Sequence, residues 1–217
     1  MIQTNNVERF QQISTTNLSD AMDKLGIAGG CLGIAPVVQG VKMAGTAYTV
    51  HYIPCGQVKG TVGDYIDDVK PGDVVVIDNA GRKYCTVWGD ILTMYAKDRN
   101  IAGTLIDGVC RDIPNIRKLA YPVYSKGCYM VTGKDRVEVD AVQVPISIAG
   151  VQVRPGDVVV GDDTGVVVIP KERADEVYEV AVEIGKAEDG IEKMVLSGRS
   201  IAEARRTYGY HTLQRRQ

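Results

Sequence analysis

Apolar and polar residues alternate along this chain with two periods, one typical of helices and one typical of strands. The helical period appears first, in residues 14–26, where apolar residues recur at positions i, i+3, i+4 and i+7 and predict one buried helix face. That face consists of Leu18, Ala21, Met22 and Leu25. The hydroxyl groups available to cap the start of this helix are those of Thr15, Thr16 and Ser19, and Gly26 is suited to end it.

Runs rich in Val, Ile and Thr follow and predict strands. Residues 45–53 (GTAYTVHYI) form one such run, and residues 56–69 are expected to be a loop with a short helix. Residues 69–81 (VKPGDVVVIDNAG) predict a turn, a buried strand and a loop at the carboxyl end of that strand. Because residues 153–165 (VRPGDVVVGDDTG) repeat the phrase PGDVVV, we expect two equivalent turn-and-strand units.

Helical and strand patterns alternate between residues 74 and 124. The helix predicted at 88–100 has an apolar side made of Ile91, Leu92, Tyr95 and Ala96. A strand then ends at Asp107 and Gly108, and a strand at 121–127 closes the series. The helix between these two strands has an apolar side made of Ile113, Ile116 and Leu119. This alternation predicts the α/β class.

The pattern changes to β beyond residue 133 and to a long helix from Lys171 to about Leu196, which could break near Gly185 or Gly190. We therefore expect one domain over residues 1–217, with a helical segment from about 171. The tail beyond residue 198 is rich in arginine, and we interpret it as solvated or as a subunit contact in preference to a nucleic-acid arm. Its charged residues are Arg199, Glu203, Arg205, Arg206, Arg215 and Arg216.

Composition narrows the function classes. The 217 residues carry a formal net charge of -2, which excludes a broadly basic nucleic-acid binder. No apolar run is long enough to span a membrane, and the first residues lack the pattern of a secretory signal, so a cytoplasmic location is expected. Five cysteines without a CxxC pair argue against a disulfide framework or a Cys-type zinc site, and we interpret them as free thiols.

Candidate chemistry lies where strands end and helices begin, since ligands of α/β sheets bind there. The segment Gly89-Asp90-Ile91-Leu92 opens a helix, and its unsatisfied N–H groups suit an anion such as a carboxylate. Asp90 could equally be a simple cap. Arg111 and Asp112 follow a strand, where Arg111 suits a carboxylate and Asp112 a cation; the alternative is a solvated surface pair.

Asp90, twenty residues, and then Arg111-Asp112 form the pattern D-x20-R-D. With GTAYTV, PGDVVVIDNAG, the block 88–113, YPVYSKG and PGDVVVGDDTG in this order, the chain resembles the class II pyruvate aldolases of the RraA-like family. That group includes 4-hydroxy-4-methyl-2-oxoglutarate aldolase and 4-carboxy-4-hydroxy-2-oxoadipate aldolase. The resemblance implies a compact αββα sandwich of the swivelling-domain type, assembled as a homotrimer or as a homohexamer built from two trimers.

The resemblance also implies a site. The backbone of residues 89–92 would receive the carboxylate of a 2-oxo acid, and Arg111 would hold that acid and stabilise its enolate. Asp112 would bind a divalent metal, Mg²⁺ or Mn²⁺, directly, and Asp90 would reach it through water. An acidic residue of a neighbouring subunit would complete the site, and Glu188 is the candidate here, with Asp189 as the alternative. A solvated helix face is the competing interpretation of both.

Three functions remain open at this stage. The first is a metal-dependent lyase that cleaves a 4-hydroxy-2-oxo acid to pyruvate and a carbonyl product, with oxaloacetate decarboxylation as a side activity. The second is a protein-binding regulator of ribonuclease E that keeps a vestigial site. The third, another transferase or hydrolase, is disfavoured because no G-x-G-x-x-G follows a strand. Tyr84, His51 and Lys83 are unranked candidates for contacting the distal end of a substrate.

Overall fold

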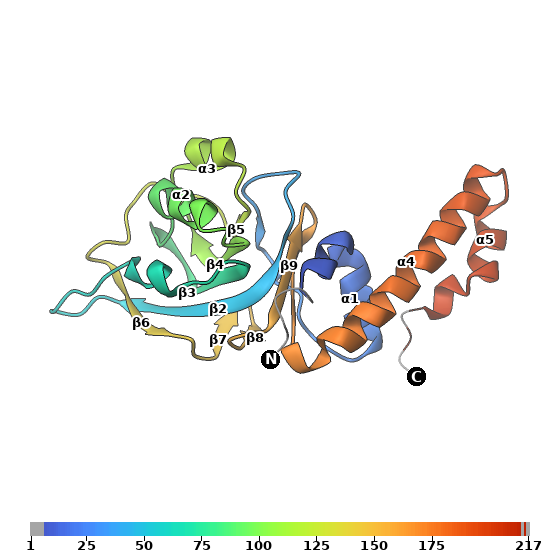
Figure 1. Cartoon of the computed structure of the whole chain (residues 1–217), viewed down its shortest axis with the longest axis horizontal. Helices are drawn as coiled ribbons and strands as arrows, with labels where there is room; N and C mark the ends of the chain where they lie inside the picture. The colour runs from blue at the N-terminus through green and yellow to red at the C-terminus, as the bar shows by residue number, and fades with distance from the viewer. Residues whose placement is uncertain (1–6, 214, 216–217) are drawn as a thin grey trace.

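A mixed β-sheet forms the centre of the computed structural model, which describes residues 7–213 and 215 (Figure 1). Within these residues the sheet has eight strands in the order β1-β5-β4-β3-β2-β9-β10, and β6 pairs with the far part of β2. The strands are β1 Ala35–Pro36, β2 Met43–Pro54, β3 Asp73–Thr86, β4 Gly103–Val109, β5 Val123–Ser125, β6 Val137–Val142, β9 Val158–Asp162 and β10 Gly165–Ile169. A separate hairpin pairs β7 Ile146–Ile148 with β8 Val151–Val153. The predicted α/β class is confirmed.

The described residues contain five α-helices: α1 Thr15–Lys24, α2 Asp90–Asp98, α3 Ile113–Leu119, α4 Ala174–Leu196 and α5 Ile201–Thr207. The short 3-10 helices are η2 Glu8–Gln12, η3 Asp64–Asp68, η4 Lys171–Arg173 and η5 Tyr210–Thr212. Figure 1 shows α2 and α3 together over one part of the sheet, and α1 with α4 beside β9.

Strand β2 joins the two halves of the sheet. It runs parallel to β3 from Thr46 to His51 and antiparallel to β9 from Met43 to Thr46. The two PGDVVV phrases therefore lie on either side of β2, as β3 and β9, and Thr46 is paired with Asp73 in one and with Val158 in the other. The repeat supplies a turn and a strand twice, as expected, but one copy is parallel to its neighbour and the other antiparallel.

Alternating side chains of the central strands enter different cores. In β3, Val75 and Ile77 pack under α2 and α3, whereas Val74 and Val76 face an interior that is covered by the β7–β8 hairpin. Both faces of a parallel strand are thus buried, which explains the uninterrupted apolar run VVVI. A third core lies between the outer side of β9 and β10 and the helices α1 and α4.

The sheet curls until strands distant in its order approach each other. Tyr124 of β5 lies against Gly161 of β9, where an added Cβ atom would be 2.7 Å from the Tyr124 ring. The hydroxyl of Tyr124 donates to the carbonyl of Val41 at 3.1 Å. Glycine at 161 therefore makes room for the ring that fills the interior of a nearly closed sheet.

Helix α1 forms as the spacing predicted, although its cap is a different residue. Leu18, Ala21 and Met22 are buried, and Gly26 follows with a left-handed φ of 71°. The cap is Ser14, whose side-chain oxygen accepts the N–H of Asn17 at 3.1 Å.

Thr15, a proposed cap, instead attaches the helix to the sheet. Its N–H and its hydroxyl donate to the two carboxylate oxygens of Asp162 at 2.8 and 2.7 Å, and Thr164 N–H donates to the same carboxylate at 2.9 Å. Burial opposes ionisation of Asp162, but these hydrogen bonds outweigh it and lower the pKa of its carboxyl. A lowered pKa contributes stability above the ordinary value of about 3.9, and this contribution is lost as the pH falls through the folded-state value.

The end of β3 also differs from the sequence prediction. Residues 78–81 were expected to be a loop, but β3 continues through them to Thr86. The pairing with β4 shifts between Asp78 and Arg82, and Ala80 and Gly81 take left-handed φ values of 49° and 67°. Two residues with positive φ let the strand absorb the extra length as a bulge in place of a loop.

The predicted helix break near Gly185 or Gly190 is absent, and α4 runs unbroken from Ala174 to Leu196. Both glycines serve packing. A Cβ atom at Gly190 would lie 2.3 Å from the ring of Tyr208, and one at Gly185 would lie 3.1 Å from the Asn17 amide nitrogen. The two glycines thus leave space for the side chains of Tyr208 and Asn17 to pack directly against the backbone of α4.

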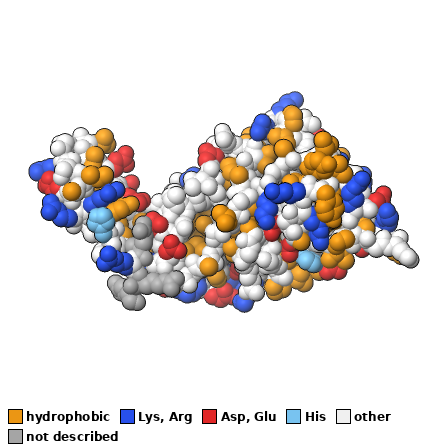
Figure 2. Space-filling view, turned by 180° about the vertical axis from the view of Figure 1, so that it is seen from behind, with side chains coloured by type: hydrophobic (Ala, Val, Ile, Leu, Met, Phe, Trp, Pro, Cys, Tyr) orange, Lys and Arg blue, Asp and Glu red, His pale blue; other side chains and the backbone are white. Residues whose placement is uncertain are grey.

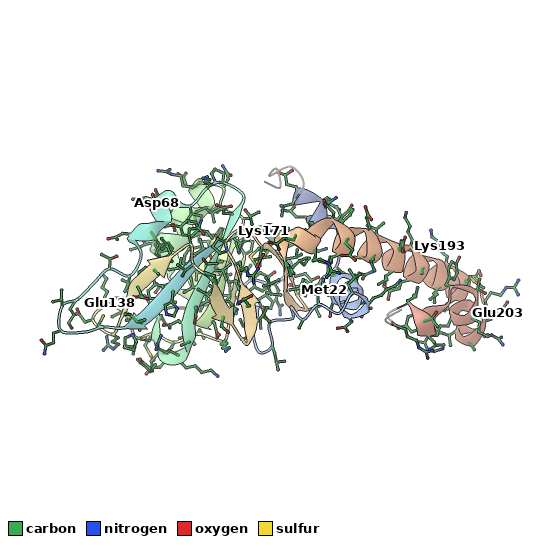
Figure 3. The ribbon with its side chains drawn as sticks, turned by 90° about the horizontal axis from the view of Figure 1, so that it is seen from below. Met22, Asp68, Glu138, Lys171, Lys193 and Glu203 are labelled. Carbon is green, nitrogen blue, oxygen red and sulfur yellow. The ribbon has the colours of Figure 1, made fainter. Side chains whose placement is uncertain are left out.

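The end of α4 and α5 form an arm that extends away from the sheet (Figures 1 and 3). Figure 3 places Lys193 and Glu203 on this arm, at the opposite end of the molecule from Asp68 and Glu138. Figure 2 shows basic side chains on the arm. This part of the chain contains Arg199, Arg205 and Arg206. Arg216 lies outside the described residues. No helix in the described part of the chain is both long and apolar enough to cross a membrane.

We predict that Thr15→Val lowers the free energy of unfolding by roughly 1–3 kcal/mol, the usual loss for a hydrogen bond to a charged group. The substitution keeps the shape of the side chain but removes the hydroxyl that donates to Asp162. Urea denaturation near neutral pH measures the loss. Thr16→Val is the matched control, since this neighbouring hydroxyl is exposed. An equal loss in both variants would show that the Asp162 contact is not the cause.

Candidate functional site

A pocket of about 430 Å³ opens between α2, η3 and the loop that follows β4. Its walls come from residues 62–64, 66–67, 86–92 and 132–134, together with Tyr95, Arg111 and Asp112. The six residues that the sequence analysis singled out within one chain therefore line a single pocket: Gly89, Asp90, Ile91, Leu92, Arg111 and Asp112.

The parallel pairing of β3 and β4 brings these segments together. Residue Thr86, the last of β3, is paired with Val109, the last of β4. Because both strands run in the same direction, the chain leaves both at the same edge of the sheet. The N–H of Arg111 donates to the carbonyl of Trp88 at 3.0 Å, and this hydrogen bond joins the segment after β4 to the segment after β3.

Arg111 and Asp112 are in contact. The guanidinium Nε of Arg111 lies 3.3 Å from Oδ2 of Asp112, and both side chains are about one-third exposed, at 38% and 35%. The N–H of Asp90 donates to the same carboxylate oxygen over 3.4 Å. In the described part of the chain Oδ1 of Asp112 accepts no hydrogen bond, so this oxygen remains available to a ligand.

The close approach of the Arg111 and Asp112 side chains to the backbone of residue 89 explains why a glycine precedes Asp90. Gly89 is the N-cap of α2 in an extended conformation, with φ -154° and ψ -166°. A Cβ atom here would lie 2.6 Å from Oδ2 of Asp112 and 3.4 Å from Nε of Arg111. Only a residue without a side chain leaves space for the Arg111–Asp112 pair against the start of the helix.

Asp90 joins α2 to α3. Its Oδ2 accepts the side-chain amide of Asn115 at 2.7 Å. The alternative of Asp90 as a simple cap is not supported, because the start of α2 has no side-chain capping bond and its N-cap is Gly89. Its second carboxylate oxygen, Oδ1, takes no hydrogen bond from the described residues.

The first turn of α2 presents backbone donors to the pocket. The N–H of Thr93 is the first that bonds within the helix, to the carbonyl of Gly89 at 3.1 Å, so helix geometry gives the N–H groups of Ile91 and Leu92 no internal acceptor. The positive end of the helix dipole is at the same place. This turn is therefore suited to a carboxylate.

A buried hydrogen-bond chain makes this turn rigid. The indole N–H of Trp88 donates to the hydroxyl of Thr93, which donates to the carbonyl of Gly89, both at 2.8 Å. Trp88 also stacks on Tyr121 with ring centroids 6.4 Å apart. The sequence analysis placed Ile91 on the buried side of this helix, but Ile91 is 72% exposed and Thr93 is buried. The reason is that Ile91 lies in the first turn, which lines the pocket.

Several pocket residues were missed by the sequence analysis. Lys134 adds a second cation to the lining, and η3 contributes Asp64 and Asp67. Tyr95 donates its hydroxyl to Asp67, and this hydrogen bond is the main cause of its raised pKa. Lys134, Asp64 and Asp67 come from a loop and a 3-10 helix that carry no periodic signal, so only the folded chain shows that they line the same pocket as Arg111.

The three distal candidates lie elsewhere. Tyr84, Lys83 and His51 do not line this pocket. His51 has its Nδ1 3.2 Å from Oδ2 of Asp78 and lines a different hollow of about 620 Å³, beside Asp140 and Ser147. Tyr84 is exposed on the bulged part of β3.

Glu188 is also remote from the pocket within one chain. It lies on α4, where its Oε2 accepts the side-chain amide of Asn17 at 3.1 Å. Figure 3 shows Lys193, little more than one turn further along α4, at the other end of the molecule from Asp68 of η3. Any role of Glu188 or Asp189 at this pocket therefore requires a second copy of the chain, and that role remains a prediction.

The donor set limits which metal could bind. Among the residues that the structure describes, no group of three or more His, Cys, Asp or Glu side chains is placed to hold an ion. Asp90 and Asp112 each keep one free oxygen beside the pocket. Two carboxylates fit a hard cation such as Mg²⁺, which needs few protein ligands and retains several waters.

Comparison with known proteins identifies relatives across most of the chain. A family model described as "RraA-like: Aldolase/RraA" matches residues 15–168. Protein DlpA of Legionella pneumophila is 43% identical over 95% of this chain, which spans only 34% of that longer protein. A protein of Halalkalibacterium halodurans, provisionally named as a 4-hydroxy-4-methyl-2-oxoglutarate aldolase, is 35% identical over 81% of both chains.

Solved structures agree with this assignment. An uncharacterized protein from Pseudomonas syringae is 42% identical and superposes with a TM-score of 0.87 over 92% of this chain and 96% of its own. RraAS2 of Streptomyces coelicolor, described as an unusual member of the RNase ES inhibitor RraA protein family, is 30% identical with a TM-score of 0.78. That superposition covers 84% of this chain and 93% of the other.

We predict that Asp112→Ala is less stable than Asp112→Asn by about 1 kcal/mol. Asp112 has a left-handed backbone, with φ 60° and ψ 36°, which Asn and Asp tolerate and which costs other residues roughly 1–2 kcal/mol. Urea denaturation of both variants measures the difference. Equal stabilities would show that the backbone at 112 relaxes when the side chain changes.

Proposed function

The chain belongs to the RraA-like family, and we propose that it is a lyase that cleaves a 4-hydroxy-2-oxo acid to pyruvate and a carbonyl product. The observation that carries the proposal is the meeting of Arg111, Asp112 and the first turn of α2 in one pocket. The provisional aldolase name of a relative that is 35% identical supports the same reaction class.

Substrate binding follows from the donors of the pocket. The N–H groups of Ile91 and Leu92, at the positive end of α2, are assigned to the carboxylate of the 2-oxo acid. Arg111 presents a planar guanidinium whose donors suit two oxygens of an oxo-acid at once. Its contact with Asp112 holds that guanidinium against the wall of the pocket before substrate arrives.

The proposal includes a divalent cation, Mg²⁺ or Mn²⁺. Asp112 would hold it directly and Asp90 through water, each with the carboxylate oxygen that is free of hydrogen bonds. Such a cation supplies Lewis acidity toward the 2-oxo group. Asn115 keeps the Asp90 carboxylate turned toward α3 at 2.7 Å, so that Asp90 reaches the pocket through a water molecule.

Arg111 contributes to the chemical step. When the bond between C3 and C4 breaks, negative charge develops on the 2-oxo oxygen, and a fixed cationic donor at that oxygen stabilises it. Loss of carbon dioxide from oxaloacetate produces the same pyruvate enolate. Oxaloacetate decarboxylation is therefore the expected side activity of the same residues.

Assembly is part of the proposal. One chain offers two carboxylates to the proposed cation, those of Asp90 and Asp112, and Glu188 of a neighbouring subunit would supply a third through water. This requires a trimer or a pair of trimers, in which the arm formed by α4 and α5 reaches the next subunit.

A regulator that binds a ribonuclease is the alternative function. The likeness to RraAS2, described as belonging to an RNase ES inhibitor family, favours it. The intact set of Asp90, Arg111 and Asp112 in an open pocket favours the enzyme, since a purely protein-binding surface has no need of it.

The deciding experiment measures pyruvate release from oxaloacetate and from a panel of 4-hydroxy-2-oxo acids, with Mg²⁺ or Mn²⁺ and with EDTA. We expect release with either metal, loss of release in EDTA, and recovery when metal is restored. Fractions from gel filtration are assayed separately, and activity should elute with a trimer or a larger species. Absence of release from every substrate would favour the regulator, and an active monomer would remove Glu188 from the site.

We predict that Arg111→Lys lowers kcat/KM roughly 10²- to 10³-fold for aldol cleavage and for oxaloacetate decarboxylation alike, the usual cost of losing one donor at a developing oxyanion. Lys keeps the charge but offers no planar pair of donors. The thermal midpoint should barely change, because an exposed ion pair contributes about 0–1 kcal/mol. Loss of one activity with retention of the other would exclude a shared enolate.

A further inference from the structure

Two cysteines lie side by side where β4 ends. Cys110 forms an isolated parallel bridge with Cys128. Its N–H donates to the carbonyl of Gly127 at 3.2 Å, and its carbonyl accepts the N–H of Tyr129 at 3.0 Å, so the two backbones are paired on both sides of Cys128.

This pairing suits a covalent link. Neighbouring strands of a sheet are about 4.8 Å apart, and a disulfide joins residues whose Cα atoms are roughly 4.4–6.8 Å apart. Partners in a parallel bridge also direct their side chains to the same face. Cys110 belongs to the same core as Ile116, and its sulfur lies 3.6 Å from the Ser125 hydroxyl and 3.8 Å from the carbonyl of Gly127, next to Cys128. Cys128 lines a hollow with Ile113.

The two thiols differ in access. Cys110 is fully buried, while Cys128 is exposed. Cys128 lines a hollow of about 220 Å³ with Arg117 and Lys126. The ammonium group of Lys126 is already paired with Asp107. Arg117 donates its Nε–H to the carbonyl of Val37, and its side chain is exposed to solvent. An anionic reagent would thus meet a cation beside the accessible thiol.

The other thiols of the chain lack this combination. Cys31 and Cys85 are buried, and burial raises the pKa of Cys31 to about 12. Cys55 is partly exposed, but its pKa is raised by desolvation and by the carboxylate of Glu138. Cys55 therefore provides a natural control.

We propose that Cys128 is a site of thiol–disulfide exchange with low-molecular-weight disulfides that carry carboxylates, and that Cys110 completes the exchange as the resolving thiol. Cys128 loses its proton to solvent, and its thiolate attacks the disulfide RS–SR. A bond forms between the Cys128 sulfur and one RS group, and the other RS group leaves as a thiolate.

Cys110 then loses its proton and attacks the Cys128 sulfur, which releases the second RS group as a thiolate and forms the Cys110–Cys128 disulfide. Two protein thiols are oxidised, and one small disulfide is reduced to two thiols. Gly127 has open space around it and φ of 139°, so the segment next to Cys128 can adjust as the bond forms.

The location gives this exchange a consequence. Arg111 directly follows Cys110 in the chain, and its N–H is bonded to Trp88 in the wall of the main pocket. A disulfide at Cys110 would therefore restrain the segment that carries Arg111 and Asp112. This last step rests on the proposed function, whereas the exchange itself does not.

The test treats the reduced full-length protein with oxidised glutathione and follows its intact mass. We expect a transient gain of one glutathionyl group, then a product lighter than the reduced protein by two hydrogens, with Cys110 and Cys128 joined in the peptide map. Cys110→Ser should stop at the glutathionyl adduct, and Cys128→Ser should form neither product. Cys55→Ser, the matched control, should behave as the wild type does.

An unchanged mass in the wild type, or modification located on Cys55, overturns the proposal. If Cys110→Ser fails to fold, the peptide map of the wild type decides alone. Arg117→Gln should react several-fold more slowly with oxidised glutathione but at the wild-type rate with neutral 2-hydroxyethyl disulfide. Equal slowing with both reagents would exclude recognition of the carboxylates. Because mass is measured and not turnover, these outcomes stand apart from the success or failure of the lyase proposal.

Discussion

The parallel pairing of β3 with β4 is the constraint on which the rest of this structure depends. Parallel neighbours must be connected by a crossover, and here the crossover carries α2 back over the sheet. The same geometry makes both strands end at one edge, so residues about twenty positions apart in the chain, Gly89 and Arg111, become neighbours. The main pocket is thus a direct product of strand direction, and no side chain has to be recruited from a distant part of the chain to bring Asp90, Arg111 and Asp112 together.

The segments of the chain that contain these two strands also include irregular backbone. Asp112 takes a left-handed backbone, and β3 contains the bulge at Ala80 and Gly81. The bulge lets β3 absorb extra length while it stays in the sheet, and the left-handed Asp112 begins α3 after the chain has left β4. The buried contacts of Trp88 with Thr93 and Tyr121 hold the turn between them in place. The pocket therefore combines a rigid base, held by the buried contacts of Trp88, with irregular backbone at its rim, at Asp112.

Much of the fold could be predicted from the sequence because periodicity reports burial. The face of α1 formed by Leu18, Ala21 and Met22 and the α/β alternation of residues 74–124 are of this kind. Where polar groups decide the structure, the prediction was wrong: Ser14 caps α1 while Thr15 bonds to Asp162, which is distant in sequence. The core of the candidate site follows strand ends and was predictable, whereas Lys134 and Asp67 come from aperiodic segments whose position only tertiary packing determines.

The attachment of α1 has a consequence for how the chain folds. Thr15 and its partner Asp162 are 147 residues apart, and the core behind α1 is completed by α4. During synthesis α1 therefore emerges before β9, β10 and α4, and the core that these elements complete cannot form until they have followed it from the ribosome. The half of the molecule built on β3, β4, α2 and α3 depends on contacts much closer in sequence, and such contacts form faster than long-range ones. The order of assembly is thus the reverse of the order of synthesis for this helix: α1 is made before α2 and α3 but is packed after them.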